Sequence, residues 1–133
     1  MPNIQHLNPA ELHPSAAYSL GVSVPATARV VHVGGQNGID AEGRIVGKGD
    51  IAAQTARALD NLSAVLAAGG ARLDDLVGLS VYVVRDADIR LAFGVWAKVW
   101  ANRGVPPMVK LLRVVGLANP DCLIEIEGLA AIV

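Results

Sequence analysis

The feature that most constrains the fold is the alternation of side chains in Leu123-Ile124-Glu125-Ile126-Glu127 near the C-terminal end. Successive residues of a β-strand point to opposite faces of a sheet, so both glutamates share one face and both isoleucines the other. Apolar side chains favour burial, whereas an unpaired charge is costly to bury. The segment therefore predicts a strand with one face on a core. Its carboxylate face would meet a wet cleft, a seam between subunits or open solvent.

Hydrophobic periodicity predicts the order strand, strand, helix, strand, helix, strand, strand. The strands are expected at 18–24, 29–33, 76–84, 108–115 and 122–133, and residues 25–28 would form a turn between the first two. One helix is expected at 51–68, after Asp50 as its N-cap and before Gly69-Gly70. A second helix would begin after Asp86 or Asp88 and stop at Gly104.

Both predicted helices are amphipathic. The apolar stripe of the first is expected on Ile51, Ala58, Leu59, Leu62, Val65 and Leu66, with Gln54, Arg57 and Asp60 largely off it. The second helix would turn Ile89, Phe93, Trp96 and Trp100 inward. This combination predicts an α+β layer, in which two helices pack on one face of a mixed, mostly antiparallel sheet. The other sheet face would be solvated or covered by another subunit.

Composition narrows the classes of function. The 133 residues fit one domain, 1–133, and the net charge of −1 without a basic block disfavours nucleic-acid partners. No apolar run reaches about 18 residues and no signal peptide is evident, so no membrane span is expected. The single cysteine, Cys122, fits a reducing compartment, and we expect a cytoplasmic protein. The mean hydropathy of +0.44 favours apolar surface hidden in an oligomer.

Few motifs in the sequence indicate a chemical function on their own. The three histidines, His6, His13 and His32, are scattered without zinc-ligand spacing, so no metal site is predicted. The run from Gly34 to Gly38, Gly-Gly-Gln-Asn-Gly, follows a predicted strand. It favours a turn or bulge over a backbone cradle for a small anion.

Glu125 admits two interpretations. It is either an ordinary surface carboxylate or a cleft residue that orients water for attack on a carbon–nitrogen double bond, or moves a proton. In the second case Lys110 would balance its charge. Tyr18 is either a core residue or a hydrogen-bond donor at the cleft.

Several motifs, in this order and spacing, resemble the Rid family of enamine and imine deaminases, also called the YjgF or endoribonuclease L-PSP family. The likeness runs from Ala17 to Ile132. It is carried by Ala17-Tyr18-Ser19, Val33-Gly34-Gly35-Gln36, Gln54 with Leu59-Asp60-Asn61-Leu62, Val81-Tyr82-Val83, and Leu117 followed by Glu125-Ile126-Glu127. The resemblance implies a chorismate-mutase-like fold and a homotrimer with clefts between subunits. It also implies cofactor-free hydrolysis of 2-aminoacrylate-type enamines or imines to 2-keto acids and ammonia.

By the same resemblance, Glu125 would hold the attacking water, and Tyr18, Gly34, Gly35 and Phe93 would lie at the substrate. Gly34 and Phe93 stand where many relatives carry serine and asparagine, so two polar groups are absent. Each departure alters the polar character expected of the family pocket.

The chain also departs from the family at the arginine that grips the substrate carboxylate in a Pro-Ala-Arg-Ser/Thr segment. The matching residues run from Pro106 to Lys110. Counting from Pro106, Leu117 or Glu125 puts Met108, Val109 or Lys110, respectively, at the arginine position. Lysine offers a point charge in place of a planar fork, and losing that fork costs about 1.5–3 kcal/mol of binding.

Three functions follow from these observations. The first is a cofactor-free hydrolase of an imine, enamine or related small metabolite. The second is a trimeric small-molecule-binding module that has lost catalysis. The third, a ribonuclease or translation inhibitor, is disfavoured by the near-zero net charge and the lack of a basic–aromatic stripe.

Overall fold

Both α-helices in the described part of the chain begin where short acidic side chains cap them. In a computed structural model that describes residues 3–133, helix α1 spans Ile51–Ala68, and the Asp50 carboxylate accepts a hydrogen bond from the Ala53 N–H. Gly70, with a φ of 76°, follows the end of α1. Helix α2 (Ile89–Trp100) begins after Asp88, whose carboxylate accepts from the Arg90 N–H. The predicted cap Asp50 is confirmed, and of the two alternatives predicted for the second helix the cap is Asp88.

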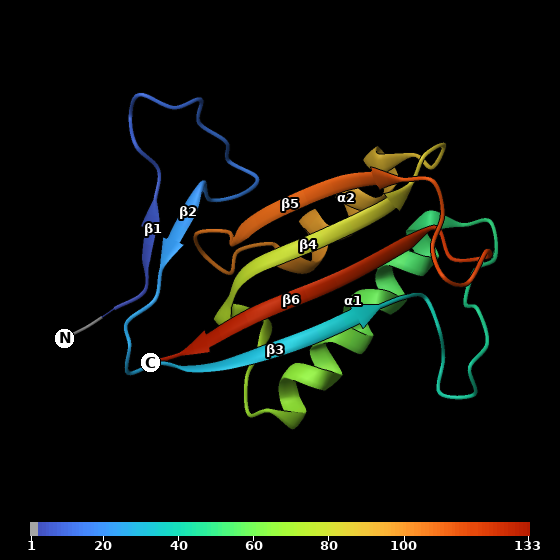
Figure 1. Cartoon of the computed structure of the whole chain (residues 1–133), viewed down its shortest axis with the longest axis horizontal. Coiled ribbons are helices and arrows are strands. Elements are labelled where there is room, and N and C mark those ends of the chain that lie inside the picture. The colour runs from blue at the N-terminus through green and yellow to red at the C-terminus, as the bar shows by residue number, and fades with distance from the viewer. Residues whose placement is uncertain (1–2) are drawn as a thin grey trace.

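Both helices lie on the same side of a four-stranded sheet (Figure 1). The strands are β3 (Arg29–Gln36), β4 (Leu76–Val84), β5 (Met108–Val114) and β6 (Ile124–Ile132), in the order β3-β6-β4-β5. A short 3-10 helix, η1 (Leu73–Asp75), precedes β4. Strand β6 is antiparallel to both neighbours, whereas β4 and β5 are parallel and joined through α2. The predicted α+β architecture, with a mixed and mostly antiparallel sheet, is confirmed.

The prediction of an N-terminal hairpin between residues 18–24 and 29–33 is wrong. The strand predicted at 18–24 is reduced to β2 (Gly21–Ser23), which pairs with β1 (Gln5–Leu7) in a separate ribbon. Strand β3 pairs instead with β6, at the far end of the chain. Closeness in sequence favours a hairpin, but pairing with β6 places Val33 and Ala130 in the buried core. Burying these apolar side chains offsets the cost of closing a long loop.

The alternation in β6 is confirmed. Ile124 and Ile126 are buried beneath the helices, whereas Glu125 and Glu127 are partly exposed on the opposite side. We call this opposite side the open face of the sheet. The residues of β4 and β5 that share it in register are Gly78, Ser80, Tyr82, Met108, Lys110 and Leu112.

Three side chains differ from the predicted helix stripes. Gln54 is fully buried, because it lies between Ile51 and Ala58 at helical spacing and all its polar atoms find partners. Val65 is 37% exposed because Leu66 takes the place facing the core. Phe93 is 50% exposed, since its neighbour Ala92 faces the sheet instead. Neither helix of residues 3–133 is long and apolar enough to cross a membrane.

Candidate functional site

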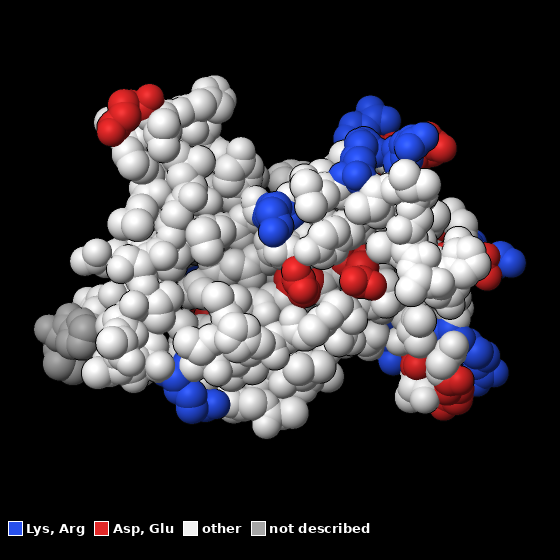
Figure 2. All heavy atoms as spheres, viewed as in Figure 1, with Lys and Arg blue, Asp and Glu red and all other residues white. Residues whose placement is uncertain are grey.

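The open face carries two neighbouring rows of polar side chains. In the first row, Ser80 of β4 pairs in register with Lys110 on one side and Glu127 on the other. In the second row, Tyr82 pairs with Glu125 of β6. Charged atoms are sparse over the middle of this face, and most of them gather nearer the margins of the molecule (Figure 2).

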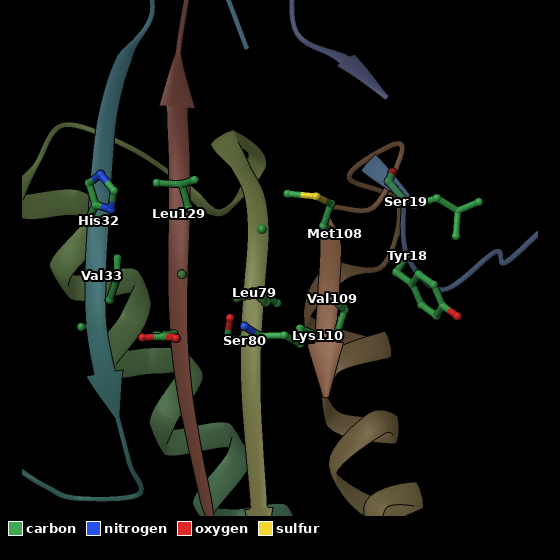
Figure 3. Close-up of a pocket in the computed structure, with 15 residues that line it drawn as sticks. Tyr18, Ser19, His32, Val33, Leu79, Ser80, Met108, Val109, Lys110 and Leu129 are labelled. Atoms are coloured by element: carbon green, nitrogen blue, oxygen red, sulfur yellow. The ribbon is translucent and has the colours of Figure 1, made fainter. Parts of the chain in front are cut away.

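A hollow of 720 Å³ lies over the first row. It brings together four of the predicted site residues, Tyr18, Gly34, Val109 and Lys110, with Ser80 and Glu127. The Lys110 side chain reaches across β4 toward Ser80, whereas Tyr18 lies beyond the outer side of β5 (Figure 3). Among the described residues that line the hollow, Lys110 is the only lysine or arginine.

The three alternative registers for the family arginine differ in the face they reach. Met108 and Lys110 lie on the open face, whereas Val109 packs partly against the core beneath the sheet. Met108 carries no charge, so Lys110 is the side chain that offers one at this position. Its single ammonium group cannot form the planar fork of a guanidinium.

Glu125 lies on the same face as the hollow but is not among the residues that line it. Its Oε1 accepts a hydrogen bond of 3.2 Å from Nδ2 of Asn37, which also donates to the Ile124 carbonyl at 3.2 Å. Gly35 passes so close that a Cβ on it would lie 2.5 Å from Oε2 of Glu125. The carboxylate is therefore confined between an amide donor and a glycine backbone.

The Gly-Gly-Gln-Asn-Gly run forms a β-bulge, as the sequence favoured. Between Val33 and Gln36 the strand advances three residues while its partner advances two, from Gly128 to Ile126. A bulge bends its strand and changes the direction of the side chains that follow. Here it brings Gly35 and Asn37 to the side of Glu125.

Glu127 and Tyr82 form a second polar pair that the sequence reasoning did not assign to the site. The Tyr82 hydroxyl donates to Oε1 of Glu127 at 2.8 Å. This bond, and to a lesser extent burial and the negative charge of Glu127, raises the pKa of Tyr82 above its ordinary value. The alternation of Ser80 and Tyr82 along β4 was the available signal, because it places both on one sheet face.

A serine and a histidine also meet at the margin of the hollow. His6 Nδ1 lies 2.8 Å from Ser19 Oγ, and the Ser19 hydroxyl donates to the Pro106 carbonyl. Because the one hydroxyl proton goes to that carbonyl, His6 must be the donor in its bond to Ser19. The pair therefore ties the start of β5 to the N-terminal segment, and it is not arranged as a base-activated nucleophile.

Phe93 stands apart from the other predicted site residues. It lies on α2, beneath the sheet, where it lines a small apolar hollow together with Val109 and Leu111. Lys110 and Phe93 of one chain therefore lie on opposite sides of the sheet. No group of three or more histidine, cysteine, aspartate or glutamate side chains in residues 3–133 is placed to hold a metal ion.

Comparison with known proteins identifies the family. The family model described as Endoribonuclease L-PSP matches residues 8–132. The chain belongs to this family, the Rid or YjgF family. A RutC family protein of Saccharolobus solfataricus is 36% identical over 118 residues, which cover 88% of each chain.

Solved structures of Rid proteins share the fold. A Rid protein of unknown function from Yersinia pestis has a TM-score of 0.85 and 34% identity, covering 98% of this chain and 99% of its own. A YjgF-family protein of Mycobacterium tuberculosis has a TM-score of 0.67 and 31% identity, covering 87% of each chain. The fold and family implied by the sequence motifs are therefore confirmed.

Proposed function

We propose that this Rid-family chain is a cofactor-free hydrolase of a reactive imine or enamine that works in clefts between three copies. The observation that carries the proposal is the fixed carboxylate of Glu125 on the open sheet face, near a hollow that contains Lys110. Family membership supports the reaction class, because the Rid family is known for this chemistry.

In the proposed reaction, Glu125 orients a water molecule and takes a proton from it as the oxygen attacks the imine carbon. The adduct carries a hydroxyl and an amino group on one carbon. Proton transfer to the nitrogen then allows ammonia to leave, and the oxygen becomes the carbonyl of the product. An enamine joins this route after a proton moves from its nitrogen to its carbon. Each step uses only water and protons, so the reaction balances without a cofactor.

The hollow suggests how the substrate is held. Lys110 would attract a substrate carboxylate, with Ser80 beside it, and Tyr18 and the backbone at Gly34 would border the ligand. Gly35 would border it from beside Glu125. Phe93 would reach this ligand only from a neighbouring copy, because it lies beneath the sheet of its own chain. This separation supports a site built from two subunits.

We further propose that the open face is covered by two other copies in a homotrimer. Leu112 and Val30 are 45% and 42% exposed on strands of this face. Sealing such side chains in a seam is favourable. We place the trimer in the cytoplasm, since the buried free thiol of Cys122 fits a reducing compartment.

The direct test is hydrolysis of 2-imino acids generated in the assay by an amino-acid oxidase, followed by the disappearance of the imine. Glu125→Gln should lower kcat by about 100-fold or more, the usual contribution of a general base. Lys110→Met should raise KM about 10-fold, because one charge-assisted contact is lost. Glu42→Gln, an exposed carboxylate in a turn, is the matched control and should leave both constants unchanged.

Full activity of Glu125→Gln would remove Glu125 from the mechanism. Absence of turnover in the wild-type trimer with every imine tested would favour the second candidate, a binding module. That candidate is supported by the segment Met108-Val109-Lys110, which offers no guanidinium in any of the three registers and at most the point charge of Lys110. It predicts that small carboxylates raise the thermal unfolding midpoint without being consumed, and that Lys110→Met weakens this effect.

A further inference from the structure

A continuous series of contacts leads from helix α1 to the carboxylate of Glu125. The side-chain amide of Asn61, on α1, donates to the backbone carbonyls of Asn37 and Ile39 at 3.1 and 2.9 Å. Asn37 in turn donates to Oε1 of Glu125. Asn37 and Glu125 lie 88 residues apart in sequence, so the contact depends entirely on the fold.

The glycines beside Asn37 make this arrangement close-fitting. A Cβ at Gly38 would lie 2.7 Å from Cα of Gln54, so the loop after β3 rests directly against α1. A Cβ at Gly35 would collide with the Glu125 carboxylate. Helix α1 therefore holds the loop that carries Asn37. Strand β3, which precedes this loop, limits the space of the Glu125 carboxylate.

We infer that Asn37 is a positioning residue for Glu125, and that Asn61 holds the loop from which Asn37 acts. This inference rests on the proposed function, in which Glu125 orients the attacking water. An amide that donates to one carboxylate oxygen restricts rotation of the carboxylate, whose two oxygens together keep further acceptor sites for water. Misplacing a catalytic group by about 1 Å can cost about 100-fold in rate.

Asn37 also donates to the Ile124 carbonyl, so a purely structural role must be separated from positioning. A structural role predicts that losing the amide weakens substrate binding and stability together. Positioning predicts a fall in kcat with little change in KM. It also predicts that Asn37 responds to the charge of Glu125 and not to that of Glu127, which bonds Tyr82.

The first experiment needs no activity. The side-chain amide signals of Asn37 are assigned in the intact protein by ¹H–¹⁵N NMR, from their loss in Asn37→Ala. They should shift in Glu125→Gln, where a neutral acceptor replaces the carboxylate, and stay in place in Glu127→Gln. The signals of Asn102, exposed in the turn after α2, serve as the internal control.

The second experiment uses imine hydrolysis. Asn37→Ala and the shape-matched Asn37→Asp, which cannot donate when ionised, should lower kcat about 10- to 100-fold and change KM less than about 3-fold. Asn61→Ala should lower kcat less, because the loop keeps its packing on α1. Asn102→Ala should match the wild type.

The outcomes are distinct. If the side-chain amide signals of Asn37 do not shift in Glu125→Gln, the inference is overturned, whatever the activity assays show. A kcat equal to that of the wild type in Asn37→Asp would also overturn it. If the wild type hydrolyses no imine, the proposed function fails, and the NMR result alone decides whether Asn37 holds the Glu125 carboxylate.

Discussion

The two carboxylates of β6 are neighbours on one sheet face, yet they have different partners. Glu125 accepts from an uncharged amide that the bulge of β3 delivers. Glu127 accepts from a phenol on the adjacent strand. An amide cannot give up its proton in water at ordinary pH, whereas a phenol can. The Glu127 pair therefore responds to alkaline pH, and this response is measurable.

We predict that Tyr82 ionises above the ordinary tyrosine value of 10.0, because its proton is held in the bond to Glu127. The folded chain thus retains a proton that the unfolded chain releases. The resulting stabilisation is fully present below pH 10.0 and is lost as pH rises through the folded pKa of Tyr82.

Ultraviolet titration of the phenolate in Tyr18→Phe isolates Tyr82, because the chain has two tyrosines. Adding Glu127→Gln should move the titration of Tyr82 back toward pH 10.0. An unchanged titration in that double variant would contradict the assigned cause.

At the scale of elements, the buried amide of Gln54 connects α1 to two loops. Its Nε2 donates to the carbonyls of Gly47 and Asp121, both at 3.1 Å, and its Oε1 accepts from the Leu123 N–H at 2.8 Å. Asp121 and Leu123 directly precede β6, so this one side chain fixes the entry of the strand that carries both carboxylates.

We predict that Gln54→Leu destabilises the protein by roughly 2–4 kcal/mol, because three hydrogen bonds worth about 0.5–1.5 kcal/mol each are lost. Thr55→Val is the matched control. Thr55 is equally buried but makes a single hydrogen bond within the helix, to Ile51, so its loss should cost about 1 kcal/mol. Urea denaturation at one protein concentration compares the two variants. A smaller loss for Gln54→Leu than for Thr55→Val would refute the role of Gln54.

At the scale of the whole molecule, the proposed homotrimer depends on the open face of the sheet. We predict a solution mass of about 41 kDa, three times the 13.8 kDa of one chain. The thermal unfolding midpoint should rise with protein concentration, because folding and association are linked. Leu112→Asp should lower the mass by placing a charge in the seam. Val115→Asp, whose parent side chain is 80% exposed after β5, should leave it unchanged. Sedimentation equilibrium measures the solution mass of the wild type and of both variants. A wild-type mass of 13.8 kDa would exclude the trimer.

The sequence alone predicted most of the features that neighbouring residues encode. Helix caps, the strand of alternating glutamates and isoleucines, and the bulge at Gly34-Gly35 all depend on spacings of a few residues. These spacings fix which face of an element is apolar, and burial then follows. The family motifs, in their order along the chain, predicted the overall fold that these elements form.

Tertiary structure alone decided the contacts between distant segments. The pairing of β3 with β6, the hydrogen bonds of Gln54 to Asp121 and Leu123, and the meeting of Asn37 with Glu125 leave no periodic trace in the sequence. Each depends on the register of strands far apart in the chain, and a shift of one residue would turn every side chain of a strand to the other face. Packing of the whole core selects that register, so only the folded chain shows which polar groups share the site.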